Sequence, residues 1–234
     1  MKMRKLLSAV ALFLCMGMTA CGASTNSSSV APTTAPVQNS EAEVYTPAVP
    51  VSSSDGSDIS WDRIVQKGDF VMGLETTFPP LSYEDESGEI IGFEIDLANE
   101  VCKRLGITLV KQPIVWEEKE DDLALGKIDC VWNGMSVTPS RQKEMCLSDT
   151  YMENHLVFVV PADSGITTAD DLKGKTVCAQ AGSTAEELIQ ADYAGAFTTI
   201  DVEDNFDSLR QFGLGFFDAV CGDSVFIDYW IANQ

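Results

Sequence analysis

Arg141 is one of 15 basic residues in a chain of 234 residues that carries 36 acidic residues and a formal charge of −21. It follows an apolar run and the stretch Gly-Met-Ser-Val-Thr-Pro-Ser. Thr138 suits the N-cap of a helix and Pro139 its first position, so we expect Arg141 in the first turn. A solvated cation there opposes the helix dipole and costs about 0.3–1 kcal/mol. That cost is explained if the helix start, the Ser136 hydroxyl and the guanidinium together hold a carboxylate.

The sequence leaves a second interpretation of Arg141 open. The side chain can instead lie at the surface, in an ion pair with Glu144 or Glu120. Physical argument from the sequence alone does not separate the two interpretations.

Ser183 and Thr184 mark a second helix start, after the apolar run TVCAQ and Gly182. Ser183 with Glu186, or Thr184 with Glu187, has the spacing of a capping box. Taken alone, this pattern is typical of a plainly capped helix. Two helix starts at the carboxyl ends of strands, one in each half of the chain, favour a ligand cleft between the halves. Open α/β sheets bind their ligands at that edge.

Apolar runs of strand length alternate with helical periodicity from residue 69 onward. Strand, helix and strand joined by short connections predict crossover units on a largely parallel sheet, with helices on both faces. The sequence therefore predicts an α/β protein of two lobes that join near residues 155–161. We expect strands over 69–74, 107–112, 128–132, 155–160, 176–180, 197–202 and 218–223, a hairpin over 81–93, and helices over 94–105, 117–125 and around 205–212.

The N-terminus has the features of a secretory leader. Three basic residues precede an apolar run that is too short for a membrane span. The run ends in MTAC, which resembles the lipobox of bacterial lipoproteins, so we expect a signal peptide over 1–20 and a lipid on Cys21. A plain signal peptide followed by a chance cysteine is the alternative. Residues 21–60, rich in Ser, Thr, Ala and Pro, are expected to form a disordered tether to the membrane.

The composition argues against several classes of function. Without residues 1–20 the chain keeps twelve basic and 36 acidic residues, and a surface of charge −24 repels nucleic acid and anionic lipid. Of the seven cysteines, five lie beyond Cys21, an odd number without CxxC spacing. Three of those five stand in apolar, strand-like runs, where a free cysteine behaves as a small hydrophobic residue. We therefore expect no disulfide framework, no metal site and no cofactor.

Four segments, in this order and spacing, resemble family 3 of the bacterial extracellular solute-binding proteins, the amino-acid receptors of ABC importers. They are GLETTFPPLSYEDESGEIIGFEIDLANEVCKRLGI, ALGKIDCVWNGMSVTPSRQKEMCLSDTY, DLKGKTVCAQAGSTAEELI and FFDAVCGD. The resemblance runs from about Asp62 to the C-terminus. It implies a Venus flytrap with the type II periplasmic-binding-protein fold. Lobe 1 would cover 61–157 and lobe 2 would cover 158–234, and their cleft would close on a free amino acid.

The resemblance also implies how the two charged ends of the amino acid are held. Arg141 would bind the α-carboxylate, together with Ser136 and with Ser183–Thr184. Gly134 would offer its carbonyl oxygen, and Asp223 its carboxylate, to the α-ammonium group. Each buried charge of the zwitterion would thus meet a partner of opposite sign. A solvated Asp223 at the end of a strand is the alternative.

Four further positions would contact the side chain of the ligand. Phe78 and Trp116 would enclose its apolar part, with a place in the hydrophobic core as the alternative for both. Glu75 and Gln180 would lie at its polar end. Family members with lysine near position 180 suit acidic or amide ligands, but a carboxylate ligand beside Glu75 without a cation is unfavourable. We therefore expect glutamine, arginine, lysine or histidine, and not glutamate or aspartate.

The chain ends with SVFIDYWIANQ, where the family continues with a strand that returns to lobe 1. The resemblance therefore implies that the chain is truncated at its C-terminus and that lobe 2 is incomplete. The single histidine, His155, is expected to be a structural residue at the crossover between the lobes.

The leading interpretation is a lipid-anchored, monomeric receptor outside the cytoplasm, at the cell surface or in the periplasm. It would deliver a polar or basic amino acid to an ABC permease and would not be an enzyme. Two alternatives belong to other classes. Cyclohexadienyl dehydratases share the fold but need a general acid, for which Glu75 is the candidate. The other alternative is a sensor module or a remnant that no longer transports.

Overall fold

The computed structural model of the protein describes residues 2–6 and 58–233. Cys21, most of the expected signal peptide and nearly all of the expected tether lie outside these ranges. Residues Lys2–Leu6 form strand β1, which pairs in parallel with β8 (Leu156–Pro161) and was not expected from the sequence. None of the helices in the two described ranges is both long and apolar enough to cross a membrane.

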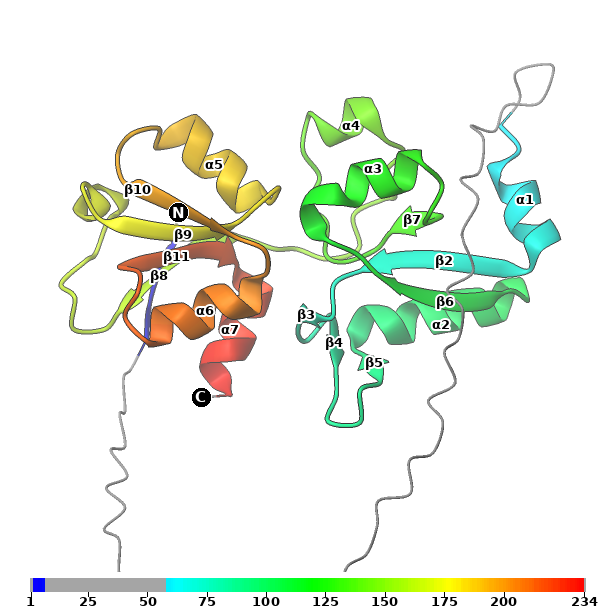
Figure 1. Ribbon diagram of the computed structural model, residues 1–234, viewed down its shortest axis with the longest axis horizontal. Coiled ribbons are helices and arrows are strands. Elements are labelled where there is room, and N and C mark those ends of the chain that lie inside the picture. Colours follow the sequence, from blue (N-terminus) through cyan, green and yellow to red (C-terminus); the bar gives the residue numbers. More distant parts are fainter. Residues whose placement is uncertain (1, 7–57, 234) are drawn as a thin grey trace, which may run out of the picture. The chain divides into compact units, whose positions relative to one another are not determined.

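The first lobe, residues 58–155, holds two small sheets (Figure 1). In one sheet β2 lies between β6 and β7 and is parallel to both. In the other, β3, β4 and β5 form an antiparallel meander. Helix α2 packs on β6, and α3 packs on β7. The elements are α1 (Ser60–Lys67), β2 (Asp69–Leu74), β3 (Thr77–Phe78), β4 (Ser82–Glu84), β5 (Ile90–Ile91), α2 (Phe93–Leu105), β6 (Thr108–Pro113), η1 (Trp116–Glu118), α3 (Lys119–Ala124), β7 (Cys130–Val131) and α4 (Arg141–Glu144).

The second lobe, residues 156–233, forms one sheet together with β1, in the order β1-β8-β11-β9-β10. Strand β9 is parallel to β10 and β11, whereas β8 is antiparallel to β11, so the sheet is mixed. Helix α5 covers one face, and α6 and α7 cover the other (Figure 1). Besides β8, the elements are η2 (Ala169–Leu172), β9 (Thr176–Gln180), α5 (Thr184–Asp192), β10 (Thr198–Val202), α6 (Asn205–Gly213), β11 (Ala219–Asp223) and α7 (Ser224–Ala232).

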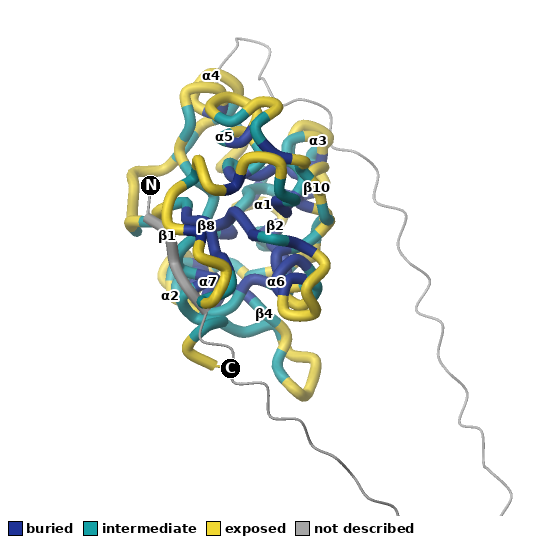
Figure 2. The backbone as a smooth tube through the Cα atoms, turned by 90° about the vertical axis from the view of Figure 1, so that its left-hand side faces the viewer, coloured by how far each residue is buried: buried dark blue, intermediate teal, exposed yellow. Residues whose placement is uncertain are grey.

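The side chains of β8 alternate between two hydrophobic cores. Val157 and Val159 face the core beneath α6 and α7, whereas Phe158 and Val160 face the core beneath α5. Figure 2 shows this strand within the buried interior. A strand that is buried on both faces is apolar at every position. This explains why the sequence reads as a continuous apolar run there, without alternation.

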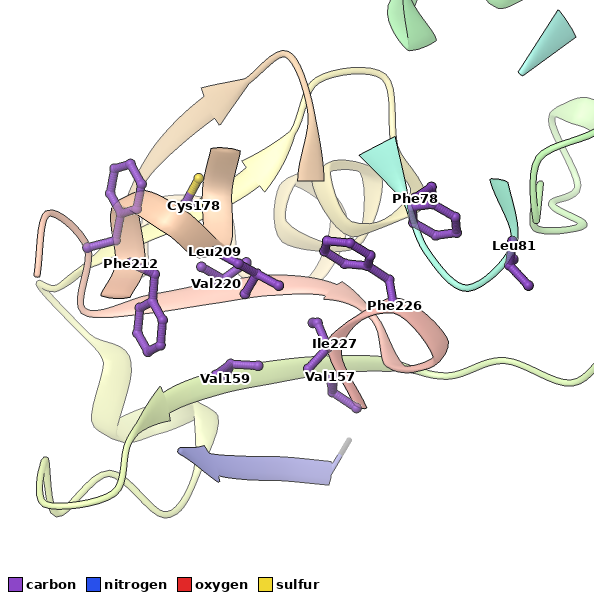
Figure 3. Close-up of a cluster of buried hydrophobic side chains, with 11 residues drawn as sticks. Phe78, Leu81, Val157, Val159, Cys178, Leu209, Phe212, Val220, Phe226 and Ile227 are labelled. Atoms are coloured by element: carbon purple, nitrogen blue, oxygen red, sulfur yellow. The ribbon is translucent and has the colours of Figure 1, made fainter. Parts of the chain in front are cut away.

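A stacked pair of aromatic rings connects the two lobes. Phe78, at the end of β3, lies 5.3 Å from Phe226 of α7 between ring centroids, with the ring planes 10° apart. Both rings are buried, and Figure 3 shows them facing each other at one end of the cluster beneath α6 and α7. Ring pairs of this kind contribute about 0.5–1.5 kcal/mol beyond the burial of their area.

Most of the elements expected from the sequence are present, with ends shifted by a residue or two. Strands β2 and β9 have the expected bounds, and α2 ends at Leu105, where Gly106 takes a left-handed conformation. The strand expected over 128–132 is shorter and covers Cys130–Val131. Helices α1 and α7 were not expected.

The expected helix start near Arg141 is shifted. Helix α4 begins at Arg141 rather than at Pro139, and it has four residues. Thr138 still makes the hydrogen bonds of an N-cap, since its hydroxyl accepts from the Arg141 N–H (3.2 Å) and its carbonyl from the Gln142 N–H (3.0 Å). These bonds close a turn just before the helix, but the N-cap of α4 is Ser140, so the predicted cap at Thr138 is wrong by two residues and the helix is shorter than expected.

Phe226→Ala is expected to lower the free energy of unfolding by about 3–5 kcal/mol, because the ring is 1% exposed and its loss leaves a cavity beside Phe78. Phe216→Ala is the matched control: Phe216 is 67% exposed, and its loss should change stability by less than about 0.5 kcal/mol. Urea unfolding followed by fluorescence measures both values. Equal losses in the two variants would contradict the packing of Phe226.

Candidate functional site

Twelve residues from the two lobes line one cavity. All ten residues that the sequence analysis assigned to ligand binding lie on it, and Asn133 and Asn205 join them. The cavity lies at the carboxyl ends of strands, the edge where open α/β sheets bind ligands. The ten expected residues are Glu75, Phe78, Trp116, Gly134, Ser136, Arg141, Gln180, Ser183, Thr184 and Asp223.

Arg141 is buried, with 3% of its surface exposed. Its Nη1 donates to the Ser136 carbonyl (3.0 Å) and its Nη2 donates to the Gly182 carbonyl (3.4 Å). Carboxylate oxygens of Glu120 and Glu187 lie 3.9 Å from Nε and Nη2, respectively, at the outer limit of an ion pair. The buried Nε makes no hydrogen bond within the described residues. The guanidinium therefore keeps donor capacity for an anion in the cavity.

The interpretation of Arg141 as a surface arginine does not fit this geometry. Two glutamates were expected as ion-pair partners of a surface arginine. The carboxylate of Glu120 lies 3.9 Å from Arg141 Nε, which is long for an ion pair. Glu144 instead accepts a hydrogen bond from the Ser140 hydroxyl (3.2 Å). Because α4 spans only four residues, its dipole adds little to an anion site. The capacity to hold an anion rests on the guanidinium itself.

Ser183 is the N-cap of α5, as the Ser183–Glu186 spacing predicted. Its hydroxyl accepts from the Glu186 N–H (3.2 Å) and donates to the Gln180 carbonyl (2.7 Å). The Glu186 carboxylate accepts from the Gly182 N–H (2.7 Å), one residue before the cap, so the capping box is displaced. The single hydroxyl proton of Ser183 is therefore already in use.

Glu75 is a buried carboxyl group held by two side-chain amides. Gln180 Nε2 donates to its Oε1, and Asn133 Nδ2 donates to its Oε2 (3.3 Å). Burial raises the pKa of Glu75 to about 8. The hydrogen bond from Gln180 opposes this rise in pKa, and the carboxylates of Asp204 and Asp223 add to it. The ammonium group of Lys119 also acts to lower this pKa. With a pKa of about 8, Glu75 is largely protonated at neutral pH.

Asn205 fixes the orientation of Gln180. Its Nδ2 donates to Gln180 Oε1 (2.6 Å), so the amide group of Gln180 turns toward Glu75 and the Glu203 carbonyl (3.0 Å). Asn205 and Gln180 belong to the second lobe and Glu75 to the first. The polar end of the cavity is thus a network of carboxyl and amide hydrogen bonds that crosses between the lobes.

Asp223 stands at the end of β11, where its carboxylate accepts a hydrogen bond from the Asn154 amide. Burial raises the pKa of Asp223 to about 6, although that hydrogen bond and the guanidinium of Arg141 act in the opposite direction. Asp223 is not the solvated residue of the alternative interpretation. It is an ionisable group placed where a bound cation would lower its pKa.

Gly134 fits its position because the chain passes close to other atoms there. Its φ is +61°, and a Cβ would lie 2.8 Å from Cδ1 of Leu81. Its N–H donates to the buried carboxyl group of Glu94 (2.8 Å). The left-handed conformation favours glycine here, and a Cβ would also force the end of the Leu81 side chain to move.

Both aromatic residues line the cavity, and both are buried, as a place in the hydrophobic core requires. Phe78 lines the cavity and also stacks on Phe226 in the core. Trp116 lines the cavity, and the ammonium group of Lys119 lies 4.8 Å from its ring centroid. His155 is outside the cavity, and its carbonyl accepts the Ser224 N–H (2.8 Å), as expected of a structural residue at the crossover.

Sequence analysis missed Asn133 and Asn205. Asn133 stands two residues after β7, and Asn205 is the first residue of α6, three residues after β10. Both follow the carboxyl end of a strand, so the rule that located the cleft could have located them. Within the described ranges no group of three or more His, Cys, Asp or Glu residues is placed to hold a metal ion.

Comparison with known proteins identifies the family. Residues 70–212 match the family described as bacterial extracellular solute-binding proteins, family 3. The arginine-binding extracellular protein ArtP of Bacillus subtilis is 32% identical over 187 residues, which cover 78% of this chain and 70% of that protein. The chain belongs to family 3 of the bacterial extracellular solute-binding proteins.

Further relatives of this solute-binding protein confirm its fold. The crystal structure of Tv2483 bound to L-arginine is 28% identical with a TM-score of 0.73, and the match covers 76% of this chain and 74% of that one. The type II periplasmic-binding-protein fold is thereby confirmed. The L-cystine-binding protein TcyJ of Escherichia coli (strain K12) is 29% identical over 69% of this chain. This chain spans 61% of the length of TcyJ. The names of ArtP and TcyJ are those of binding proteins and not of enzymes, as expected.

Glu75→Gln is expected to remove a pH dependence of stability. Because the pKa of Glu75 is raised to about 8 in the folded chain, folding retains a proton that the unfolded chain releases near its ordinary pKa. The free energy of unfolding should therefore fall between pH 6 and pH 8, by on the order of 2 kcal/mol in the wild type and by less in the variant.

Urea unfolding at pH 6, 7 and 8 measures this difference. Glu86→Gln, in the exposed turn of the hairpin, is the control and should keep the wild-type dependence. A wild type that gains stability from pH 6 to pH 8, or a Glu75→Gln variant with the wild-type slope, would disprove the assignment.

Proposed function

We propose that the protein is a receptor outside the cytoplasm that binds a free amino acid with a cationic or polar side chain and delivers it to an ABC permease. The observation that supports this most is the set of charges in one cavity: the guanidinium of Arg141 and the carboxyl groups of Asp223 and Glu75. The carboxylate of an amino acid would meet Arg141, and its ammonium group would meet Asp223. Arg141 is buried and Asp223 is half-buried, and each gains a partner of opposite sign.

Glu75 determines which side chains fit. Once Arg141 and Asp223 are paired, one buried carboxyl group remains. A guanidinium, ammonium or imidazolium group would form an ion pair with it, and the amide of glutamine could hydrogen-bond to it. The side chain of glutamate would place two carboxyl groups together with only the neutral amide of Gln180 nearby, which is unfavourable. The arginine named for ArtP and bound to Tv2483 makes L-arginine the first ligand to test.

The membrane anchor and the closure of the lobes are inferred from the sequence. A lipid on Cys21 would hold the protein at the membrane, and residues 21–60 would serve as its tether. The lobes expected over 61–157 and 158–234 would close as two bodies around one ligand. In this proposal the receptor acts as a monomer, with the permease as its protein partner.

Calorimetric titration with the twenty amino acids tests the proposed ligand class. We expect binding of arginine, lysine, histidine or glutamine, and no tight binding of glutamate or aspartate. Arg141→Ala should weaken binding by about 100-fold or more, because it removes the buried partner of the α-carboxylate. Arg104→Ala is the control, since Arg104 forms an exposed ion pair with Glu100 within α2. Tight glutamate binding, or equal affinities of the Arg141→Ala variant and the wild type, would refute the proposal.

The affinity for L-arginine is expected to rise from pH 6 to pH 8, by up to about tenfold per pH unit. A cationic side chain binds the ionised form of Glu75, whose pKa is raised to about 8, so binding must release a proton below that pH. L-Glutamine controls for the titration of Asp223, because it has the same α-ammonium group without the second cation. Titrations in buffers of different ionisation enthalpy measure the proton release. An arginine affinity that is independent of pH, or falls as pH rises, would exclude the proposed ion pair.

A further inference from the structure

Lys119, the first residue of α3, is buried to an unusual degree for a lysine. It is 2% exposed, whereas Lys127, on the same lobe, has a side chain that is 51% exposed. Burial lowers the pKa of Lys119, while the neighbouring carboxylate of Glu120 acts to raise it. A lysine that is removed from water needs partners for all three of its N–H donors.

Three acceptors surround the ammonium group of Lys119. Two belong to the first lobe: the carbonyl of Trp116 (3.1 Å) and the carboxylate of Glu120 (3.0 Å). The third is the carbonyl of Gly182 in the second lobe (3.1 Å). Lys119 does not line the cavity, although Trp116 does. Its position thus joins the two lobes at a point beside the ligand site and outside it.

Gly182 is suited to this contact on the side of the second lobe. Its φ is +65°, and a Cβ would lie 3.0 Å from Cα of Glu117 and 3.5 Å from Nζ of Lys119. The absence of a side chain lets the backbones of the two lobes approach. The Gly182 carbonyl also accepts from Arg141 Nη2, so two cations of the first lobe converge on one carbonyl of the second.

We infer that Lys119 is a latch between the lobes, which stabilises their closed arrangement around the cavity without touching the ligand. The inference rests on the proposed binding of an amino acid by closure. The hydrogen bond from Lys119 to Gly182 exists only when the lobes are together, and when they separate the ammonium group returns to water. Lys119 therefore sets how long a ligand is held, and the groups in the cavity set which ligand it is.

Loss of the latch is expected to change the dissociation rate constant of the ligand and to leave its association rate constant unchanged. The encounter of ligand and open cleft does not involve the bond between Lys119 and Gly182, so the association rate constant should be unaffected by its loss. Dissociation requires the bond to break. Lys119→Met, which keeps the length of the side chain and removes its donors, should speed dissociation of L-arginine by about tenfold or more.

The experiment compares the wild type, Lys119→Met and Lys127→Met as full chains. Lys127 pairs with Asp122 of the same lobe (2.6 Å), so Lys127→Met removes a lysine without changing a contact between the lobes. Stopped-flow tryptophan fluorescence with L-arginine gives both rate constants. Hydrogen exchange, with and without L-arginine, is followed in peptides that cover 116–120 and 181–186.

Lys119→Met is expected to increase exchange in both peptides, one in each lobe, while Lys127→Met leaves the peptide of the second lobe unchanged. Exchange that rises only in the first lobe, or unchanged exchange together with unchanged dissociation, would overturn the latch. If the wild type does not bind L-arginine, the proposed arginine binding fails by that result alone. The exchange measured without ligand then still decides whether Lys119 joins the lobes.

Discussion

The guanidinium of Arg141 lines the cavity and is buried away from water. It has five N–H donors, and fewer than five close hydrogen-bond acceptors surround it. Two backbone carbonyls hold it in place, and two carboxylates stay at 3.9 Å. A buried cation with an unused donor stabilises any anion that enters, because little water is left to compete. The cost of placing arginine in this position is explained by the ligand end that it can hold.

The other end of the cavity is formed by a buried carboxyl group and its amide partners. Glu75 is enclosed by the amides of Gln180 and Asn133, and Asn205 holds Gln180 in the orientation that directs its donor to Glu75. Burial raises the pKa of Glu75, and the hydrogen bond from Gln180 opposes this rise only in part, so the carboxyl group holds a proton that a bound cation could displace. A lysine in place of Gln180 would remove that capacity. In the proposed function, the network connects the neutral side chain of Gln180 to the class of ligand.

Contacts between the lobes surround the cavity with groups of different chemistry. The rings of Phe78 and Phe226 stack on one side, and Lys119 and Arg141 meet the Gly182 carbonyl on another. Because each lobe supplies part of every such contact, they all depend on the lobes being together. In the proposed function, closure and ligand binding would stabilise each other, since both would require the same arrangement. Membership in a family of solute-binding proteins agrees with a cavity that is assembled in this way.

The sequence by itself determined the features of the fold that depend on local interactions. The bounds of β2 and β9, the cap at Ser183 and the glycine end of α2 all follow from residues close together along the chain. The motifs of the family also placed all ten expected residues at one cavity. Only the tertiary structure decided that Lys119 is buried, that Asn205 orients Gln180, and that Phe78 stacks on Phe226. Each of these depends on neighbours that are 25 or more residues away, such as Gly182 for Lys119 at a separation of 63. A periodicity or cap motif does not predict which distant carbonyl will accept a hydrogen bond from a side chain. The packing of the sheets and helices determines that partner.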